Sequence, residues 1–231
     1  MPGKPEPSGV VIVGDGEFGE IAYEYFLHDS LYHVVAFSVE REFRTKDDLF
    51  GLPVIDFETL ENEYEPAAHG VFVAITFTQL NRVRTRLLAE ARRKGFTPTS
   101  YVSSHAVVWP NAEVGENCFV FEHCTVQRHA RIGDNVVLWS GTNVLHRATV
   151  GANTFVSANA VIAGFGTVGT SCFLGANCCV RDYVTVADDC IVGAGAVVIE
   201  DTEPGKVYVG NPARPLEKSS FETRILPAGR P

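Results

Sequence analysis

Residues 102–119 read VSSHAVVWPNAEVGENCF, and Val102, Val108 and Val114 stand six positions apart in this stretch. The same spacing continues without a break to Val198, so that seventeen aliphatic residues share one register. A mostly small residue stands four places after each of them, and a glycine often follows the aliphatic directly. A period of six is a multiple of the two-residue period of a β-strand and does not fit a helix. The stretch is a hexapeptide repeat, which predicts a parallel β-helix.

The six-residue spacing indicates how the chain winds. If each hexad forms one short strand and one corner, every aliphatic side chain points into the interior and the small residues fit the corners. Three hexads then close a triangular coil of eighteen residues, and seventeen hexads make nearly six coils. With roughly 4.8 Å between stacked strands, the resulting prism is on the order of 25–30 Å long. We expect this all-β prism to span residues 101–216.

Composition and charge narrow the class of protein. The chain has 231 residues, of which 45% are hydrophobic, so we expect two modest domains with real cores. It contains no run of about twenty apolar residues, and its start, MPGKPEPSG, lacks the apolar segment of a signal peptide. We therefore expect a cytoplasmic protein that does not bind a membrane. A net charge of −9 argues against nucleic acid as a partner but still permits a small anionic ligand.

The six cysteines have a simple structural interpretation. Five of them occupy the small position of their hexads, namely Cys118, Cys124, Cys172, Cys178 and Cys190. Cysteine suits a small buried position, so we interpret these residues as packing residues instead of disulfides or zinc ligands. Only Cys179 stands outside this column.

A second pattern occupies the start of the chain. After residues 1–8, which are rich in Pro and Gly and expected to be disordered, the sequence VVIVGDGEFGEIAYEYF reads as a strand, a turn and a helix. Gly14, Gly16 and Gly19 spell G-x-G-x-x-G at this turn. Such a turn lets the backbone and a helix N-terminus approach a phosphate, so these glycines and Asp15 are candidate substrate contacts. A tight strand-to-helix turn without a ligand is the alternative.

Strands and helices alternate through residues 9–100. Beyond the first strand and helix, we expect strands at His33–Val39, Pro53–Asp56, Gly70–Thr76 and Thr97–Val102, and helices at 57–64 and Gln79–Lys94. This order predicts a small parallel sheet with covering helices, a Rossmann-like α/β domain. About ninety residues are too few for the two halves of a dinucleotide fold, so the domain suits a mononucleotide or a nucleotide-sugar.

Two polar residues extend the candidate nucleotide site. Glu40 lies about twenty residues beyond the glycines, where an acid accepts hydrogen bonds from ribose hydroxyls. A solvated surface charge is an equally simple interpretation of Glu40. Asn81 opens the second long helix, where it either recognises the nucleotide or belongs to a polar helix face.

Three features coincide in this chain: the glycine turn, the hexad array with a histidine in its middle, and the closing sequence Val209-Gly-Asn-Pro-Ala-Arg214. Together they resemble the bacterial sugar acyltransferases that join a nucleotide-sugar-binding domain to a left-handed β-helix. The resemblance covers Val10 to about Leu216. It implies an acetyl-CoA-dependent N-acetyltransferase of a UDP- or dTDP-linked amino sugar, with O-acetylation of a sugar or of sialic acid as the alternative. It also implies a homotrimer with active sites between neighbouring subunits.

The resemblance assigns roles within the hexad array. His146, in Asn143-Val-Leu-His146, occupies the position of the family's catalytic base. Family members often carry an acid or a second histidine directly after this base, where this chain has Arg147. Phe155 stands where some members have a histidine that contacts the acyl donor, and we expect it at the donor site.

The residues themselves support a catalytic corner. His146 is the third residue of its hexad, which points outward, and an imidazole titrates close enough to neutral pH to accept the proton of an amine. Gly164 stacks on His146 in the next coil, and Arg128 and Asp182 belong to the same column. The backbone N–H of Gly164 is a candidate donor to the oxyanion formed from the thioester, unless the glycine serves only the corner. A plain surface role is the alternative for His146.

We expect acetyl-CoA along the C-terminal coils, where cations hold its phosphates and small residues admit it close to the backbone. The candidate cations are Arg181, Lys206 and Arg214. The candidate backbone contacts are Gly164, Gly193, Ala194, Gly195 and Pro212, the last within the closing sequence. Residues 217–231 show no pattern and are expected to form a C-terminal tail.

Two other classes of protein fit parts of the pattern. His105 and His123 stack eighteen residues apart and His129 lies nearby, as in a β-helical zinc enzyme of the γ-carbonic anhydrase type. Such a site usually includes two histidines five residues apart, which these three do not provide, so we predict no metal. A non-catalytic β-helix that serves as an assembly platform predicts no thioester turnover. For a trimer, Trp139 and Phe155 are the candidate aromatic residues of the packed faces.

Overall fold

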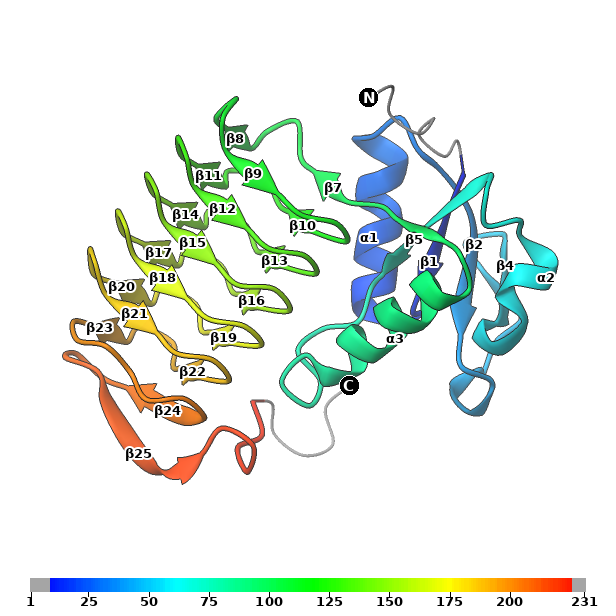
Figure 1. Cartoon of the computed structure of the whole chain (residues 1–231). Coiled ribbons are helices and arrows are strands. Elements are labelled where there is room, and N and C mark those ends of the chain that lie inside the picture. The colour runs from blue at the N-terminus through cyan, green and yellow to red at the C-terminus, as the bar shows by residue number, and fades with distance from the viewer. Residues whose placement is uncertain (1–8, 226–231) are drawn as a thin grey trace.

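The structure is a computed structural model that describes residues 9–225. It consists of a small α/β unit followed by a triangular prism of short strands, and the two lie side by side (Figure 1). Residues 1–8, where we expected disorder, and the last six residues of the chain lie outside the described part. Within residues 9–225, no helix is long and apolar enough to cross a membrane.

The N-terminal unit is built on a mostly parallel sheet with the strand order β3-β4-β2-β1-β5-β6. Its strands are β1 (Gly9–Val13), β2 (His33–Val39), β3 (Asp48–Leu49), β4 (Leu52–Asp56), β5 (His69–Val73) and β6 (Thr97–Pro98). Its helices are α1 (Glu17–His28), α2 (Leu60–Glu63) and α3 (Arg82–Arg93), with the 3-10 turns η1 (Arg41–Phe43) and η2 (Phe57–Thr59). Every residue of β1 is buried, as expected for a central strand that helices cover on both faces. Helix α1 packs on the face turned toward the prism, and α3 packs on the opposite face.

The predicted α/β order is confirmed, but α3 starts later than the sequence pattern indicated. It begins at Arg82 instead of Gln79. The preceding residues Gln79, Leu80 and Asn81 have φ angles of 50°, 50° and 64°, which lie in the left-handed region and cannot belong to a right-handed helix.

The expected strand Thr97–Val102 is in fact two strands that belong to different sheets. β6 pairs with β5 in the N-terminal sheet, whereas β7 (Tyr101–Val102) pairs with β10 in the prism. The chain therefore crosses from one unit to the other at residues 99–100.

The prism is a left-handed parallel β-helix, and all seventeen predicted hexads form strands, β7 to β23, of two residues each. Face 1 holds β7, β10 (Phe119–Val120), β13 (Val137–Leu138), β16 (Phe155–Val156), β19 (Phe173–Leu174) and β22 (Ile191–Val192). Face 2 holds β8 (Val107–Val108), β11 (Thr125–Val126), β14 (Asn143–Val144), β17 (Val161–Ile162), β20 (Cys179–Val180) and β23 (Val197–Val198). Face 3 holds β9 (Glu113–Val114), β12 (Arg131–Ile132), β15 (Thr149–Val150), β18 (Thr167–Val168) and β21 (Thr185–Val186). Each strand ends on the aliphatic of its hexad and pairs with its counterpart eighteen residues away.

The interior of the prism follows the hexad pattern. The repeat aliphatics from Val120 to Val198 are at most 3% exposed. The five cysteines of the small column are buried free thiols, which confirms their interpretation as packing residues. Burial raises the pKa of Cys118 and of Cys178 to about 12, so these thiols stay protonated at neutral pH.

The corners of the prism, each named by the two faces that it joins, require residues with positive φ. At corner 3–1 three of these are Asn117, Asn135 and Asn153, a residue type that tolerates the left-handed region. Their side chains form a ladder along the axis. Nδ2 of Asn117 donates to Oδ1 of Asn135 at 2.7 Å, and Nδ2 of Asn135 donates to Oδ1 of Asn153 at 2.8 Å.

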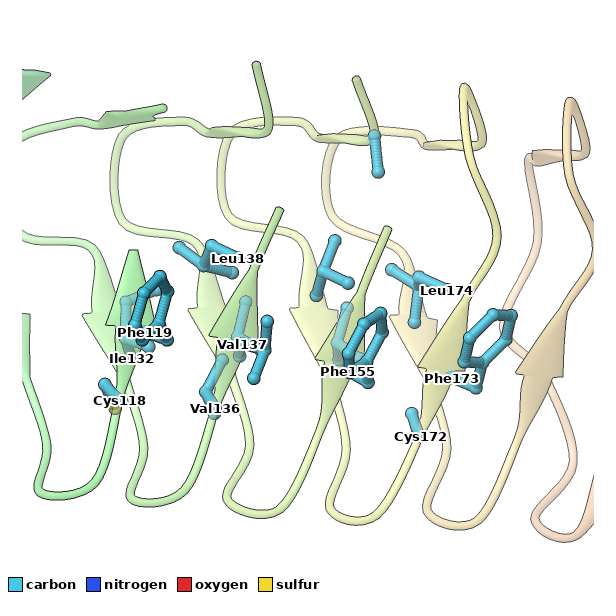
Figure 2. Packing of buried hydrophobic residues seen from close by; sticks show 14 of the residues in the cluster. Cys118, Phe119, Ile132, Val136, Val137, Leu138, Phe155, Cys172, Phe173 and Leu174 are labelled. Carbon is cyan, nitrogen blue, oxygen red and sulfur yellow. The ribbon is translucent and has the colours of Figure 1, made fainter. Parts of the chain in front are cut away.

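The N-terminal unit packs on face 1 through aromatic rings. Phe119, Phe155 and Phe173 occupy equivalent places along that face (Figure 2). The ring centroid of Phe18, in α1, lies 5.5 Å from that of Phe119. The ring centroid of Phe77 lies 5.0 Å from that of Phe155 and 4.8 Å from that of Phe173. These rings join the two units into one hydrophobic core.

This packing corrects the role expected for Phe155. The side chain is 3% exposed because the chain's own N-terminal unit covers it, so Phe155 is a core residue and neither a donor contact nor part of a face between subunits. Trp139, the other aromatic expected between subunits, is half-buried at the same seam, with its ring centroid 5.9 Å from that of Phe18.

A hairpin closes the C-terminal end of the prism. β24 (Lys206–Val209) pairs parallel with β22, and β25 (Arg214–Ser219) pairs antiparallel with β24. The tail expected from residue 217 onward therefore begins inside a strand.

Candidate active site

His146 lies at corner 2–3, between β14 and β15, on the side of the prism that faces away from the N-terminal unit (Figure 1). Its backbone N–H donates to Oε1 of Gln127 at 2.9 Å. The half-buried imidazole opens onto a hollow of about 280 Å³, which is lined by Trp109, Gln127, Arg128 and His146. The outward orientation expected for His146 is thus present in the structure.

Gly164 stacks directly on His146. A Cβ atom at Gly164 would lie 2.5 Å from Cε1 and 2.7 Å from Nε2 of His146, so no side chain fits beside the imidazole. Gly164 does not have a positive φ, so the corner geometry alone does not require glycine. Its carbonyl accepts a hydrogen bond from the N–H of Tyr183, but within residues 9–225 its own N–H has no acceptor. A free backbone donor therefore stands beside the imidazole.

Asp182 is the next member of this column. Its Oδ1 would lie 3.1 Å from a Cβ atom at Gly164, so the carboxylate approaches the same space beside Gly164 as the imidazole. The column expected from the eighteen-residue spacing, with His146, Gly164 and Asp182 on successive coils, is present.

Arg147 and two aromatic residues complete the corner. The Phe165 ring meets the His146 ring edge-on, with 5.4 Å between the centroids and an interplanar angle of 86°. The Arg147 guanidinium lies 5.9 Å from the centroid of the Phe165 ring, and Tyr183 stacks on Phe165 at 4.7 Å. Arg147 therefore directs its charge at an aromatic ring.

Phe165 and Tyr183 were not identified from the sequence. Both hold positive φ angles, 58° and 62°, which cost bulky residues of order 1–3 kcal/mol each. Equivalent positions at the other two corners carry mostly Asn, Gly, Ser or Asp. Two aromatic residues at a corner position that the other two corners fill mostly with turn-forming residues were the signal that would have pointed to them.

The three glycines of the turn in the N-terminal unit differ in how closely other atoms approach them. A Cβ at Gly14 would lie 2.8 Å from the carbonyl oxygen of Ala74, and a Cβ at Gly19 would collide with the carbonyl oxygen of Gly14. Both glycines are thus needed for close packing of strand and helix. At Gly16 a Cβ would meet nothing within 4 Å, so this residue alone of the three leaves open space.

The charges around the turn are mainly negative. Asp15 lies in the turn, and Glu17 and Glu20 lie in the first turn of α1. Lys46 donates from Nζ to the carbonyl oxygen of Asp15 at 3.1 Å, and its Nζ also lies 3.9 Å from carboxylate oxygens of Asp15 and Glu20. Lys46 was not identified as a site residue because it falls in residues 40–51, which follow no clear pattern.

Glu40 and Asn81 both have partners within the chain. Both carboxylate oxygens of Glu40 accept hydrogen bonds from Arg86 at 2.8 Å, and these bonds lower the pKa of Glu40. To accept hydrogen bonds from ribose hydroxyls, Glu40 has to share its carboxylate oxygens between the ribose and Arg86. Asn81 is fully buried and donates from Nδ2 to the carbonyl oxygen of Cys172 at 3.0 Å. It fastens the N-terminal unit to the prism, so it is neither a nucleotide contact nor part of an exposed polar helix face.

Some of the residues that we expected to bind acetyl-CoA lie along the edges of face 2. Arg181 lies at corner 2–3, two coils beyond His146. Gly193, Ala194 and Gly195 form corner 1–2 at the opposite edge of face 2. Within this group Gly193 packs under Val209, where a Cβ would lie 2.9 Å from Cγ1, whereas Ala194 and Gly195 are exposed.

The closing hairpin places the remaining candidates for acetyl-CoA binding at different ends of β24. The N–H of Ala213, between Pro212 and Arg214, donates to the carbonyl oxygen of Val197, so Pro212 and Arg214 lie at the end of face 2. Lys206 stands at the other end of β24, where the neighbouring Gly205 donates to the carbonyl oxygen of Asp188 at corner 3–1. Lys206 and Arg214 therefore do not cluster, and Lys206 is not on the face that leads to His146.

The histidines considered for zinc do not converge. His123 donates its backbone N–H to the carbonyl oxygen of His105 at corner 1–2, whereas His129 lies at corner 2–3. In the part of the chain that the structure describes, no three His, Cys, Asp or Glu side chains come together as metal ligands.

The glycine turn and His146 are not brought together within one chain. The N-terminal unit packs on face 1, and His146 lies at the corner between the other two faces (Figure 1). The glycine turn and the imidazole of one chain therefore lie on different sides of its prism.

A sequence profile described as "Bacterial transferase hexapeptide (six repeats)" matches residues 129–164, which include His146 and Gly164. No curated protein gives a match to the sequence. Among solved structures, the chain is similar to the acetyltransferase domain of PglB from Neisseria gonorrhoeae FA1090, with a TM-score of 0.81 and 27% identity over 90% of this chain and 100% of that chain. That domain has also been solved in complex with acetyl coenzyme A.

A second similar structure is PerB from Caulobacter crescentus in complex with CoA and GDP-perosamine. It matches with a TM-score of 0.80 and 30% identity over 90% of this chain and 97% of that chain. WeeI from Acinetobacter baumannii AYE shares the fold, with a TM-score of 0.57 and 21% identity over 90% of this chain and 99% of that chain.

Proposed function

The chain belongs to the hexapeptide-repeat acetyltransferases that act on nucleotide-linked amino sugars, and on this premise we propose that it transfers the acetyl group of acetyl-CoA to the amine of such a sugar. The PglB domain with acetyl coenzyme A and PerB with CoA and GDP-perosamine support this pair of substrates. UDP- and dTDP-linked amino sugars are the acceptors we expect, and the ligand of PerB adds GDP-linked ones.

The observation that carries the proposal is the pairing of an imidazole with a free backbone donor at one corner. Nε2 of His146 accepts the proton of the acceptor amine as its nitrogen attacks the thioester carbonyl carbon. The N–H of Gly164 donates to the oxyanion that forms on the carbonyl oxygen. Collapse of this intermediate breaks the carbon–sulfur bond, and the imidazolium returns its proton to the departing CoA thiolate.

We assign the acetyl-CoA arm to face 2. That face lies between corner 2–3, with His146 and Arg181, and corner 1–2, with Ala194 and Gly195. Arg181 and, at the end of the face, Arg214 are the cations available there for the phosphates of CoA.

The separation of glycine turn and imidazole supports a homotrimer. We propose that the open space beside Gly16 of one subunit, which we call the N-terminal crevice, holds the nucleotide and faces His146 of the next subunit, so that each active site is completed by two chains. Face 1 is already covered by the chain's own N-terminal unit, which leaves faces 2 and 3 for contacts with neighbouring subunits and ligands.

The proposed function is tested by measuring CoA release with a set of acceptors. The set contains UDP-, dTDP- and GDP-linked 4-amino sugars, the matching 4-hydroxy sugars and free sialic acid, each with acetyl-CoA. Turnover confined to the amino sugars is expected. Turnover only with the hydroxyl acceptors indicates O-acetylation, and no turnover with any acceptor indicates an assembly platform; either result overturns the proposal.

A further inference from the structure

The ion pairs of the chain are distributed unevenly. Among the described residues of the N-terminal unit, the lysines and arginines other than the buried Arg84 lie within 4 Å of a carboxylate, as in the pairs Arg41–Asp56, Arg44–Asp56, Lys46–Asp15, Arg82–Asp189, Arg86–Glu40, Arg92–Glu116, Arg93–Glu90 and Lys94–Glu61. Around His146 the pattern is reversed: among residues 9–225, no carboxylate pairs with Arg128 or with Arg147. In a chain with a net charge of −9, two exposed cations without counter-ions form a local positive site.

Both arginines line hollows next to the base. Arg128 stands one coil before His146, roughly 4.8 Å along the axis, and shares the hollow of about 280 Å³ with it. Arg147 lines a second hollow of about 250 Å³ on the other side of the corner, together with Glu113, His129, Arg131 and Thr149. Arg131 already pairs with Glu113 at 3.4 Å, so Arg147 is the unpaired arginine of this hollow.

The contact that now holds Arg147 is weak. Its guanidinium lies over the exposed ring of Phe165, and a cation–π contact in water is much weaker than a charge-assisted bidentate pair with a phosphate. An incoming phosphate therefore competes successfully for Arg147.

The glycine turn is a poor site for the same phosphates. Asp15, Glu17 and Glu20 surround it, and Lys46, the cation that reaches it, lies close to two of these three acids. A diphosphate placed there meets like charges, which disfavours binding. The open space at Gly16 suits an uncharged part of the nucleotide better.

We propose that Arg128 and Arg147 bind the diphosphate of the nucleotide-sugar, while the nucleoside occupies the N-terminal crevice of the neighbouring subunit. This inference rests on the proposed function. In a nucleotide-linked amino sugar, the ring separates the diphosphate from the amine. When the amine meets Nε2 of His146, the diphosphate lies about one sugar ring away, where cations on the adjacent coil and at the adjacent residue reach it.

The test is binding of UDP, dTDP and GDP, and of the corresponding nucleosides, to the intact protein by calorimetry. Arg128→Gln and Arg147→Gln should each weaken binding of the best diphosphate at least about tenfold, reduce its salt dependence, and leave nucleoside binding unchanged. Arg147→Lys should recover part of the loss because it keeps the charge. Arg93→Gln, which removes an exposed cation from α3, is the matched control and should bind like the wild type.

Two results overturn the inference. If Lys46→Gln weakens diphosphate binding and the two arginine variants do not, the phosphates lie at the glycine turn. If the wild type binds no nucleoside diphosphate better than its nucleoside, the corner has no phosphate site. The proposed function fails separately, when the wild type transfers no acetyl group to any amino sugar, whatever the arginine variants do in binding.

Discussion

At the scale of single residues, the imidazole of His146 fits its corner because the residue stacked on it has no side chain. His146→Asn keeps a polar group of similar size but cannot take a proton. We expect turnover to fall at least about 10²-fold, equivalent to roughly 2.7 kcal/mol of transition-state stabilisation, with both substrate affinities retained.

The measurement is kcat by CoA release, with affinities from calorimetry. His123→Asn is the control, because His123 has a φ of 58°, which asparagine tolerates, and lies at another corner. Near-wild-type turnover of the His146 variant shows instead that a neutral amine attacks without a base.

The three glycines of the turn differ in the space available for a Cβ atom, so their substitution by alanine should have different effects on stability. Gly19→Ala forces α1 away from the carbonyl oxygen of Gly14 and should lower the free energy of unfolding by about 1–3 kcal/mol. Gly16→Ala meets no atom and should leave stability unchanged while it weakens nucleoside binding. Urea unfolding and calorimetry measure the two effects, and equal stabilities of the two variants contradict the packing argument.

At the scale of elements, Asp29 at the end of α1 joins the N-terminal unit to the first coil. Its carboxylate accepts hydrogen bonds from Oη of Tyr101 at 2.5 Å, from the N–H of Ser104 at 2.9 Å and from Oγ of Ser103 at 3.1 Å. Burial raises the pKa of Asp29, but the hydrogen bonds outweigh it and bring the pKa down to about 2. Since the pKa is depressed, this joint stabilises the fold above about pH 4 and loses its contribution as the pH falls toward 2.

We therefore expect Asp29→Asn to be less stable than the wild type at pH 7, with a difference that shrinks as the pH falls from about 4 to about 2. Urea unfolding at a series of pH values checks this. Glu24→Gln is the control, because Glu24 pairs with the exposed His28 and should show little difference at any pH. If the free energies of unfolding of Asp29→Asn and of the wild type differ by the same amount at every pH, the depressed pKa of Asp29 does not stabilise the fold.

The repeat elements were predictable from sequence because each strand of a coil turns one aliphatic residue inward, at a fixed spacing of six residues. The same pattern could not reveal what covers a face from outside. Phe155 looked like an interface residue, and only the placement of Phe77 shows that its own chain buries it. Likewise, His146 and Gly164 followed from an eighteen-residue spacing, but Lys46 and Arg86 reach their partners through loop and helix packing that has no period.

At the scale of the whole molecule, sites shared between subunits predict complementation. His146→Asn supplies an intact crevice, and Gly16→Glu, which blocks the open space of the crevice, supplies an intact base. Each variant alone should be inactive as a homotrimer. After random subunit exchange in equal amounts, one site in four pairs two intact halves, so activity should return to about a quarter of the wild-type value.

Sedimentation of the wild type should show a trimer, and the exchanged mixture should keep that mass. If the mixture remains inactive after exchange, the crevice and the base of each active site belong to the same subunit. A monomeric mass at micromolar concentration contradicts active sites shared between subunits.

The eighteen-residue coil makes the prism a ruler with a fixed unit of length. Removing residues 175–192 deletes one whole coil and joins Leu174 to Gly193. Every later strand keeps its face, and the closing hairpin moves roughly 4.8 Å nearer to the corner with His146. Removing only residues 175–186 keeps the six-residue register but turns every later strand by one face, which moves the closing hairpin from the end of face 1 to the end of face 2. Circular dichroism should show a folded prism in both cases, and the first variant, which lacks Arg181, should bind acetyl-CoA less tightly. The distance between His146 and the closing hairpin is thus adjustable only in steps of one coil if every strand is to keep its face.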